Sequence, residues 1–179
     1  MADLKISQLT AATVPLAGTE LVPIVQGGAT KKVAAFALSA GPAFSAYMLN
    51  GSANQGISSA TFTKIKVDTE VFDTASCYDP ATYRFTPNVA GYYQISGGMS
   101  YSGSTSATRG MLLVYKNGSG DKRLGDMVAS GNGMAGSVLI YMNGTTDYLE
   151  LYAFVSAATA VVDYGPTVTW FTGAFVRGA

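Results

Sequence analysis

The sequence contains no histidine, a single cysteine and few charged residues. Charged residues make up 12% of the 179 residues, about half of the share in an average soluble domain. The absence of histidine removes the commonest general base and the commonest metal ligand. The single cysteine, Cys77, has no partner for a disulfide or for a cysteine-rich metal site. We therefore expect no catalytic residue, no metal and no cofactor.

One acid pair keeps a glycosidase-like reaction conceivable, because two carboxylates are enough for that chemistry. Asp147 and Glu150 are three residues apart, which on an extended strand turns their side chains to opposite faces. We therefore expect a protein that is not an enzyme.

The charges that are present balance, with 11 basic and 11 acidic residues. A surface with few charges and no net charge does little to keep copies of a protein apart, so we expect copies or partners to cover part of it. No basic excess indicates nucleic-acid binding, and no apolar run reaches the ~18 residues of a membrane span. Residues 1–10 lack the basic start and apolar run of a signal peptide, which indicates synthesis in the cytoplasm.

Residues 1–42 differ in composition from residues 43–179. Phe36 is the one aromatic residue in this first part, and Pro15, Pro23 and Gly27-Gly28 interrupt any helix. "TELVPIVQ" is a short extended segment in this interpretation, and residues 31–40 are a marginal helix or a linker. The sequence thus predicts an extended, largely irregular N-terminal arm. Its short apolar groups are the candidate anchors of that arm: Ile6, Leu9, Leu16, Leu21, Val22, Ile24 and Val25.

From residue 43 onward, short strand-like runs alternate with turn signals. In residues 91–102 the apolar positions Tyr93, Ile95, Met99 and Tyr101 alternate with polar ones, as in a half-buried strand. Two Asn-Gly dipeptides mark tight turns. Further strands are predicted in residues 60–68, 109–121, 136–156 and 167–176. Several such runs without helical segments between them are typical of an antiparallel sandwich or barrel.

A specific spacing lies within this part of the chain. It is formed by Asp73, Tyr78, Phe85, Gly91 and Tyr93, and the chain closes with Phe171, Gly173 and Phe175. These residues resemble the signature of the globular head of the complement q subunit, whose jelly roll is shared with tumour necrosis factor. The resemblance implies an all-β, antiparallel jelly-roll sandwich of about ten strands over residues 43–179, and a three-fold packing axis. Val67 and Gly97 depart from the signature, which has aromatic residues there.

The resemblance to such heads implies a homotrimer, and one strand suggests where its copies meet. In "DYLELYAFV" one face carries Leu149, Leu151, Ala153 and Val155, as expected of a core. The other face carries three aromatic residues, which form too apolar a strip to leave in water. We place them at the trimer interface: Tyr148, Tyr152 and Phe154. The alternative is that these side chains lie under a loop of their own head.

The leader "KISQLTAATVPLAGTELVPIVQGGATKKV" resembles the start of many structural proteins of tailed bacteriophages. That resemblance implies a virion protein whose arm docks on other virion proteins of the tail, portal vertex or capsid. A disordered tail is the alternative, but such a tail would be more charged and less apolar.

Together these features predict a non-enzymatic phage structural protein, a trimeric short fibre or spike with an outward-facing head. The alternative is a capsid decoration or cement protein that stabilises the head shell. Three segments, residues 100–110, 117–123 and 128–137, are predicted loops rich in Ser, Gly and Asn. Such loops suit a host surface glycan or protein, although each is equally well explained as a plain connection.

Overall fold

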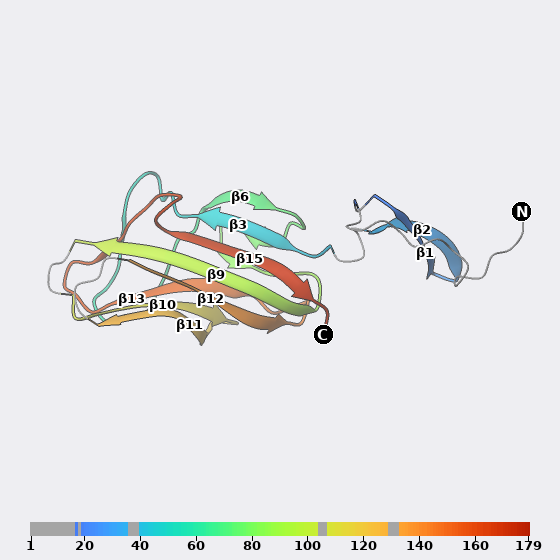
Figure 1. The fold of residues 1–179 in the computed structure, drawn as a ribbon. Helices are drawn as coiled ribbons and strands as arrows, with labels where there is room; N and C mark the ends of the chain where they lie inside the picture. The colour runs from blue at the N-terminus through green and yellow to red at the C-terminus, as the bar shows by residue number, and fades with distance from the viewer. Residues whose placement is uncertain (1–16, 18, 36–39, 104–106, 129–132) are drawn as a thin grey trace, which may run out of the picture. The chain divides into compact units, whose positions relative to one another are not determined.

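The computed structural model describes residues 17, 19–35, 40–103, 107–128 and 133–179 (Figure 1). The chain forms two compact units, residues 1–40 and residues 41–179. We call the first unit the arm and the second unit the head, and each is described by itself.

A β-hairpin forms the described part of the arm. Strands β1 (Leu21–Gln26) and β2 (Ala29–Ala34) pair antiparallel. Gly27 and Gly28 join them with φ angles of +61° and +75°, the conformation of a two-residue hairpin turn. The prediction of a largely irregular arm is therefore wrong for these residues, and Lys31–Ala34 is strand rather than helix. The two glycines act as a turn and not merely as a helix breaker.

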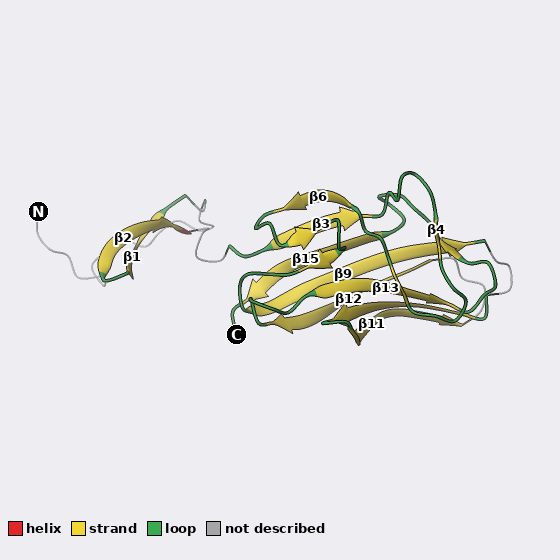
Figure 2. Cartoon of the chain, turned by 180° about the vertical axis from the view of Figure 1, so that it is seen from behind, coloured by secondary structure: helices red, strands yellow, loops and turns green. Residues whose placement is uncertain are grey.

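Two antiparallel sheets make up the head (Figures 1 and 2). The β9 sheet consists of β3 (Ala43–Tyr47), β4 (Gln55–Gly56), β6 (Thr69–Asp73), β9 (Gly91–Ser102), β12 (Gly133–Met142), β14 (Val161–Val162) and β15 (Trp170–Arg177). Its order is β4-β14-β9-β15-β3-β6, and β12 also pairs with β9. The β13 sheet consists of β5 (Thr63–Lys64), β7 (Tyr78–Asp79), β8 (Arg84–Phe85), β10 (Arg109–Lys116), β11 (Ser119–Val128) and β13 (Leu149–Val155). Its order is β11-β10-β13-β8-β7, and β5 also pairs with β13.

This architecture confirms the predicted all-β antiparallel jelly-roll sandwich. Figure 1 shows β3, β15 and β9 side by side in one layer, with β13, β10 and β11 in the other. The described residues of the head contain no helix. Of the thirteen strands in that part of the chain, five have only two residues, so the sheets are carried by the eight longer strands.

The alternation predicted for residues 91–102 is confirmed. Tyr93, Ile95, Met99 and Tyr101 are buried between the sheets. The prediction for residues 60–68 is only partly right, because the strand is limited to Thr63–Lys64. Ile65 is nevertheless buried.

The Asn-Gly dipeptides at residues 117–118 and 143–144 each lie between two strands, but two of the predicted loops are too long. Asn117 and Gly118 have positive φ and join β10 directly to β11. Residues 119–123 therefore belong to a strand, as do residues 133–137 of β12. Polar and glycine-rich composition misled the sequence interpretation here, because an outward-facing strand near the sheet margin also consists of such residues.

The last long strand lies inside its sheet. β15 pairs with β9 on one side and with β3 on the other, with Thr172 opposite both Ser96 and Ser45. The end of the head sequence thus lies between the beginning and the middle, and all three strands contribute side chains to one core.

Candidate interaction surfaces

The aromatic residues of the predicted signature meet in the core of the head around one residue, Phe44 of β3. The ring of Phe44 stacks on Phe85 with centroids 4.4 Å apart and on Tyr78 at 4.8 Å. Phe171 contacts it edge-on at 5.1 Å. Phe44 is absent from the predicted signature. The alternating burial of "AFSAY" shows that a strand pattern in residues 43–47 is the signal that identifies it.

Tyr93 extends this cluster from the neighbouring strand. Its ring lies 5.6 Å from Phe85 and 5.4 Å from Phe175, edge-on to both. Its hydroxyl donates a hydrogen bond to the carbonyl of Val89 at 2.7 Å. Burial raises the pKa of Tyr93 to about 12. Tyr78 behaves similarly, since its hydroxyl donates to the carbonyl of Val67 and burial raises its pKa.

The remaining signature residues shape the backbone around the cluster. The Asp73 carboxylate accepts hydrogen bonds from the backbone N–H groups of Ala75 and Tyr78, which fixes the turn after β6. At Gly173 a Cβ atom would stand 2.7 Å from the Phe44 ring. At Gly91 it would stand 2.4 Å from the carbonyl of Arg177. All eight signature residues therefore lie in the core of the head or at its margin, where they pack or fix the backbone.

The predicted anchors of the arm are only partly described. Ile6, Leu9 and Leu16 lie outside the described residues. Leu21, Val22, Ile24 and Val25 all lie on β1. Leu21 is 60% exposed and Val25 is 76% exposed, whereas Val22 and Ile24 on the other face of the hairpin are half-buried.

The three residues predicted at the trimer interface lie together on the outer face of the β13 sheet, and their own head covers them in part. Tyr152 stacks on Tyr115 of β10 at 3.8 Å, and burial raises its pKa. Phe154 lies 5.0 Å from Phe62, which precedes β5. The guanidinium of Arg84 stands 4.1 Å from the Tyr148 ring. These contacts fit the alternative in which the strip lies beneath neighbouring segments, and the assignment to an interface stays a prediction.

A buried carboxylate lies in the middle of the same strip. Glu150 is 1% exposed and pairs with Lys64 at 3.0 Å and with the Nε atom of Arg84 at 2.8 Å. The hydrogen bond to Glu150 raises the pKa of Arg84. Glu150 thus forms a buried ion pair with two cations, which joins β13 to β5 and β8.

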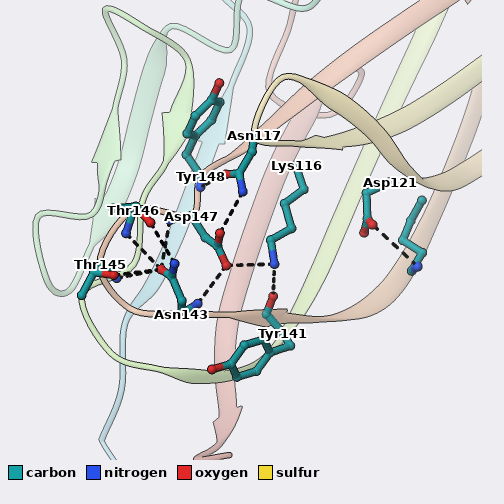
Figure 3. A network of polar contacts seen from close by, with 10 residues as sticks. Lys116, Asn117, Asp121, Tyr141, Asn143, Thr145, Thr146, Asp147 and Tyr148 are labelled. Carbon is teal, nitrogen blue, oxygen red and sulfur yellow. Dashed lines mark hydrogen bonds and ion pairs between the residues drawn. The ribbon is translucent and has the colours of Figure 1, made fainter.

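Asp147 is held in a separate network at the end of the sheet (Figure 3). Its carboxylate accepts from Asn117 at 2.8 Å and from the backbone of Asn143 at 3.0 Å, and it pairs with Lys116 at 2.8 Å. Burial opposes ionisation, yet these three donors together lower the pKa of Asp147. Asn117 in turn accepts from the backbone N–H of Tyr148. The network joins the β10–β11 turn to the connection between β12 and β13.

The outer face of the β9 sheet differs from that of the β13 sheet because its central positions carry no charge. The register brings outward-facing positions of β12, β9, β15 and β3 into rows. One row runs Ser137, Ser96, Thr172 and Ser45. We call the following twelve residues the uncharged face: Ala43, Ser45, Tyr47, Gln94, Ser96, Gly98, Ala135, Ser137, Leu139, Trp170, Thr172 and Ala174.

Small side chains make the middle of the uncharged face shallow. Ser96 and Ser137 hydrogen-bond to each other across β9 and β12 at 2.7 Å. The indole of Trp170 packs so closely over Gly98 that a Cβ there would stand 2.7 Å from the ring. Two hollows lie on this face, one of about 450 Å³ beside Trp170 and one of about 340 Å³ beside Phe72. The sequence analysis predicted polar residues between the apolar ones in residues 91–102, but it did not find the rows that these polar residues form with the neighbouring strands.

Neither a metal-binding group nor a membrane-spanning helix is found in the described ranges. No three His, Cys, Asp or Glu side chains cluster there in a way that could hold a metal ion. No helix in those ranges is long and apolar enough to cross a membrane.

Known proteins resemble this chain in their fold, but no match was found by sequence. No family model and no curated protein matches this chain. Murine APRIL has a similar structure, with a TM-score of 0.57, 12% identity and an alignment over 76% of this chain and 100% of that one. The globular domain of zebrafish complement 1qA protein gives 0.53, 15% identity, and 77% and 99% coverage. Vertex protein P5 of the phage PRD1 gives 0.55, 18% identity, and 76% and 97% coverage.

These identities are low, so the comparisons establish the fold alone. The head has the same jelly-roll fold as complement-q and tumour-necrosis-factor-like domains, as the resemblance to complement-q heads implied.

Proposed function

We propose that this chain is a non-enzymatic virion protein, a trimeric short fibre or spike. Its arm docks on the particle, and its head faces outward and binds the host surface. The fold likeness to a phage vertex protein supports this reading, and so does the leader's resemblance to the start of phage structural proteins. Self-association is supported by the low charge of the chain and by the three-fold axis that the resemblance to complement-q heads implies.

The observation that carries the proposal is the uncharged face. Burying a charge that lacks a matched partner is expensive, and the centres of protein interfaces are depleted in charged residues. The outer face of the β13 sheet carries Lys64, Arg84, Arg109, Arg123 and Asp126, whereas the uncharged face carries no charge at its twelve positions. A copy of the head that covers the uncharged face therefore desolvates no ion.

The geometry of this face also suits close packing. Side chains no larger than Ser, Thr or Ala fill its centre, so two copies approach with little side-chain entropy to lose. Leu139 is 51% exposed and the adjacent Tyr141 is 42% exposed, which supplies apolar area at one margin. We therefore propose this face as the trimer interface, with the strip of Tyr148, Tyr152 and Phe154 as the second candidate.

Two single substitutions distinguish these faces. Ser96→Arg places a charge at the centre of the uncharged face, and Tyr152→Asp places one in the aromatic strip. We expect light scattering to give three times the chain mass of 18.5 kDa for the unaltered protein and for Tyr152→Asp, and the monomer mass for Ser96→Arg. The reverse result would assign the interface to the strip. A monomeric unaltered protein at micromolar concentration would overturn the trimer itself.

The proposed docking of the arm on the particle is tested by deleting residues 2–40. The head has its own core, so we expect the truncated chain to fold and to form trimers. We also expect it not to co-sediment with particles assembled without the native protein. If the truncated chain still binds those particles, the head itself provides the attachment to the particle. That outcome would favour the decoration or cement function.

A further inference from the structure

The hairpin of the arm is an incomplete sheet. An isolated two-stranded hairpin is only marginally stable in water, and a third strand or a packed face is needed for independent stability. In the described part of the chain, β1 and β2 pair only with each other. Leu21 and Val25 are both more than half exposed on one face.

The register identifies the backbone groups that point away from the hairpin. In an antiparallel pair, hydrogen-bonded and non-hydrogen-bonded residue pairs alternate. The N–H of Ala35 donates to the carbonyl of Glu20 at 2.7 Å. Counting from that bonded pair, the non-hydrogen-bonded pairs are Leu21–Ala34, Pro23–Lys32 and Val25–Thr30. The C=O groups of these six residues, and the N–H groups of all of them except Pro23, therefore face the two outer edges.

The two outer edges are not equivalent. Pro23 has no N–H and lies at an outward-facing position of β1, so the β1 edge lacks a donor at its centre, and proline is a known means of blocking sheet edges. The β2 edge keeps a complete set, because Thr30, Lys32 and Ala34 each present one donor and one acceptor. An added strand can therefore pair fully with β2 but not with β1.

The charges of the hairpin indicate which kind of strand pairs there. Lys31 and Lys32 are consecutive on β2, and residues 21–34 contain no acidic residue. A second copy of the hairpin would bring like charges together, which destabilises a strand pair, whereas opposite charges across a pair stabilise it. Because Lys31 and Lys32 point to opposite faces, a partner strand with acidic residues at neighbouring positions matches both.

We propose that the arm docks by strand addition, with the free edge of β2 pairing with an acidic edge strand of another virion protein. This inference rests on the proposed docking of the arm and adds its mode and the chemistry of its partner. Backbone hydrogen bonds supply the affinity in such complexes, and side chains of alternate residues supply the specificity.

A matched pair of variants at Thr30 in the full-length chain tests the edge. Thr30→Pro removes a backbone donor from the β2 edge, whereas Thr30→Ala keeps that donor and shortens only the side chain. Pro23 shows that this kind of position accepts proline. We expect Thr30→Pro to weaken co-sedimentation with particles assembled without the native protein by about tenfold or more. Thr30→Ala should stay within about threefold of the unaltered chain.

Amide hydrogen exchange gives a second measurement that needs no substitution. In the free chain the outward N–H groups of Thr30, Lys32 and Ala34 should exchange rapidly. On the particle they should be protected, while those of Leu21 and Val25 should continue to exchange. Equal protection of both edges, or of neither, would overturn strand addition at β2.

Charge reversal tests the acidic partner. The double variant Lys31→Glu, Lys32→Glu should lose particle binding by about tenfold or more, whereas exchange of both residues for arginine should retain it. Unchanged binding of the glutamate variant would refute the acidic strand. If deletion of residues 2–40 abolishes attachment while Thr30→Pro does not, strand addition is wrong and docking of the arm stands. If the deletion itself has no effect, the proposed docking is wrong.

Discussion

Phe44 shows how one residue organises the core of the head. It contacts Tyr78, Phe85 and Phe171, which come from three different strands. The aromatic spacing in the sequence was sufficient to predict the outer members of this cluster. It was not sufficient to find the central one, because Phe44 lies about thirty residues before the spaced group and only the fold brings it there.

The contact between Gly173 and the Phe44 ring gives a stability prediction. Gly173→Ala would place a methyl group 2.7 Å from that ring and 2.8 Å from Ile95. Both neighbours are fully buried, so the strain cannot relax easily, and we expect a loss of about 1–3 kcal/mol in the free energy of unfolding. Urea denaturation measures this loss. Gly56→Ala, where no atom lies within 4 Å, is the control and should change stability by less than about 0.5 kcal/mol. Equal effects of the two variants would contradict the packing of the cluster.

For Tyr101 we predict a substitution that does not lower the free energy of unfolding. Among the described residues its buried hydroxyl has no hydrogen-bond partner. Removing such a hydroxyl removes a desolvation cost, so Tyr101→Phe should leave stability unchanged or raise it by about 1 kcal/mol. Tyr93→Phe is the matched control, because the Tyr93 hydroxyl donates to Val89, and its loss should lower stability by about 1 kcal/mol. A clear loss of stability in Tyr101→Phe would show that the hydroxyl is bonded.

At the scale of the strand pair, a hairpin could be predicted from the sequence only where its turn residues were specific for a tight turn. Asn117-Gly118 is a specific signal for a tight hairpin, and the structure has one there. Gly27-Gly28 adopts a similar pair of φ angles, but two glycines are equally compatible with a flexible break. The hairpin of the arm was missed for that reason. The hairpin depends on the pairing of β1 with β2, and no single residue in the sequence predicts that pairing.

The network around Asp147 predicts acid sensitivity at one end of the head. Its folded-state pKa lies below the unfolded value of about 3.9. A lowered folded pKa stabilises the head above that value, and the stabilisation disappears as the pH falls through the folded pKa. Asp147→Asn should therefore lower the free energy of unfolding by about 1–3 kcal/mol at pH 7. The difference from the unaltered protein should shrink toward pH 2. Thermal unfolding at several pH values measures it, with Asp121→Asn as an exposed control. A constant difference across that range would contradict the linkage.

At the scale of the whole molecule, the fold class could be predicted from the sequence, but the uncharged face could not. Strand alternation and turn residues can be recognised within short segments, and they predict an antiparallel sandwich or barrel. The resemblance of the aromatic spacing to complement-q heads implies the jelly roll. The rows of the uncharged face depend on which residue of β9 lies opposite which residue of β15 and β12. That register follows from the assembled sheets. The sequence analysis therefore predicted the interface at Tyr148, Tyr152 and Phe154. An aromatic strip can be recognised within one strand, whereas a face without charges can be recognised only when several strands are placed side by side.

The place of β15 in its sheet has a consequence for how the head is made. β15 lies between β9 and β3, so the β9 sheet has a gap in its interior until residues 170–177 have left the ribosome. Until then Phe44 lacks Phe171, and β3 and β9 lack the strand that joins them. Pairing over such sequence separations carries a large loop-closure cost and is slow. The head therefore cannot complete its fold before β15 is available, and a chain stopped before β15 leaves the edges of two strands and one side of the core open to solvent.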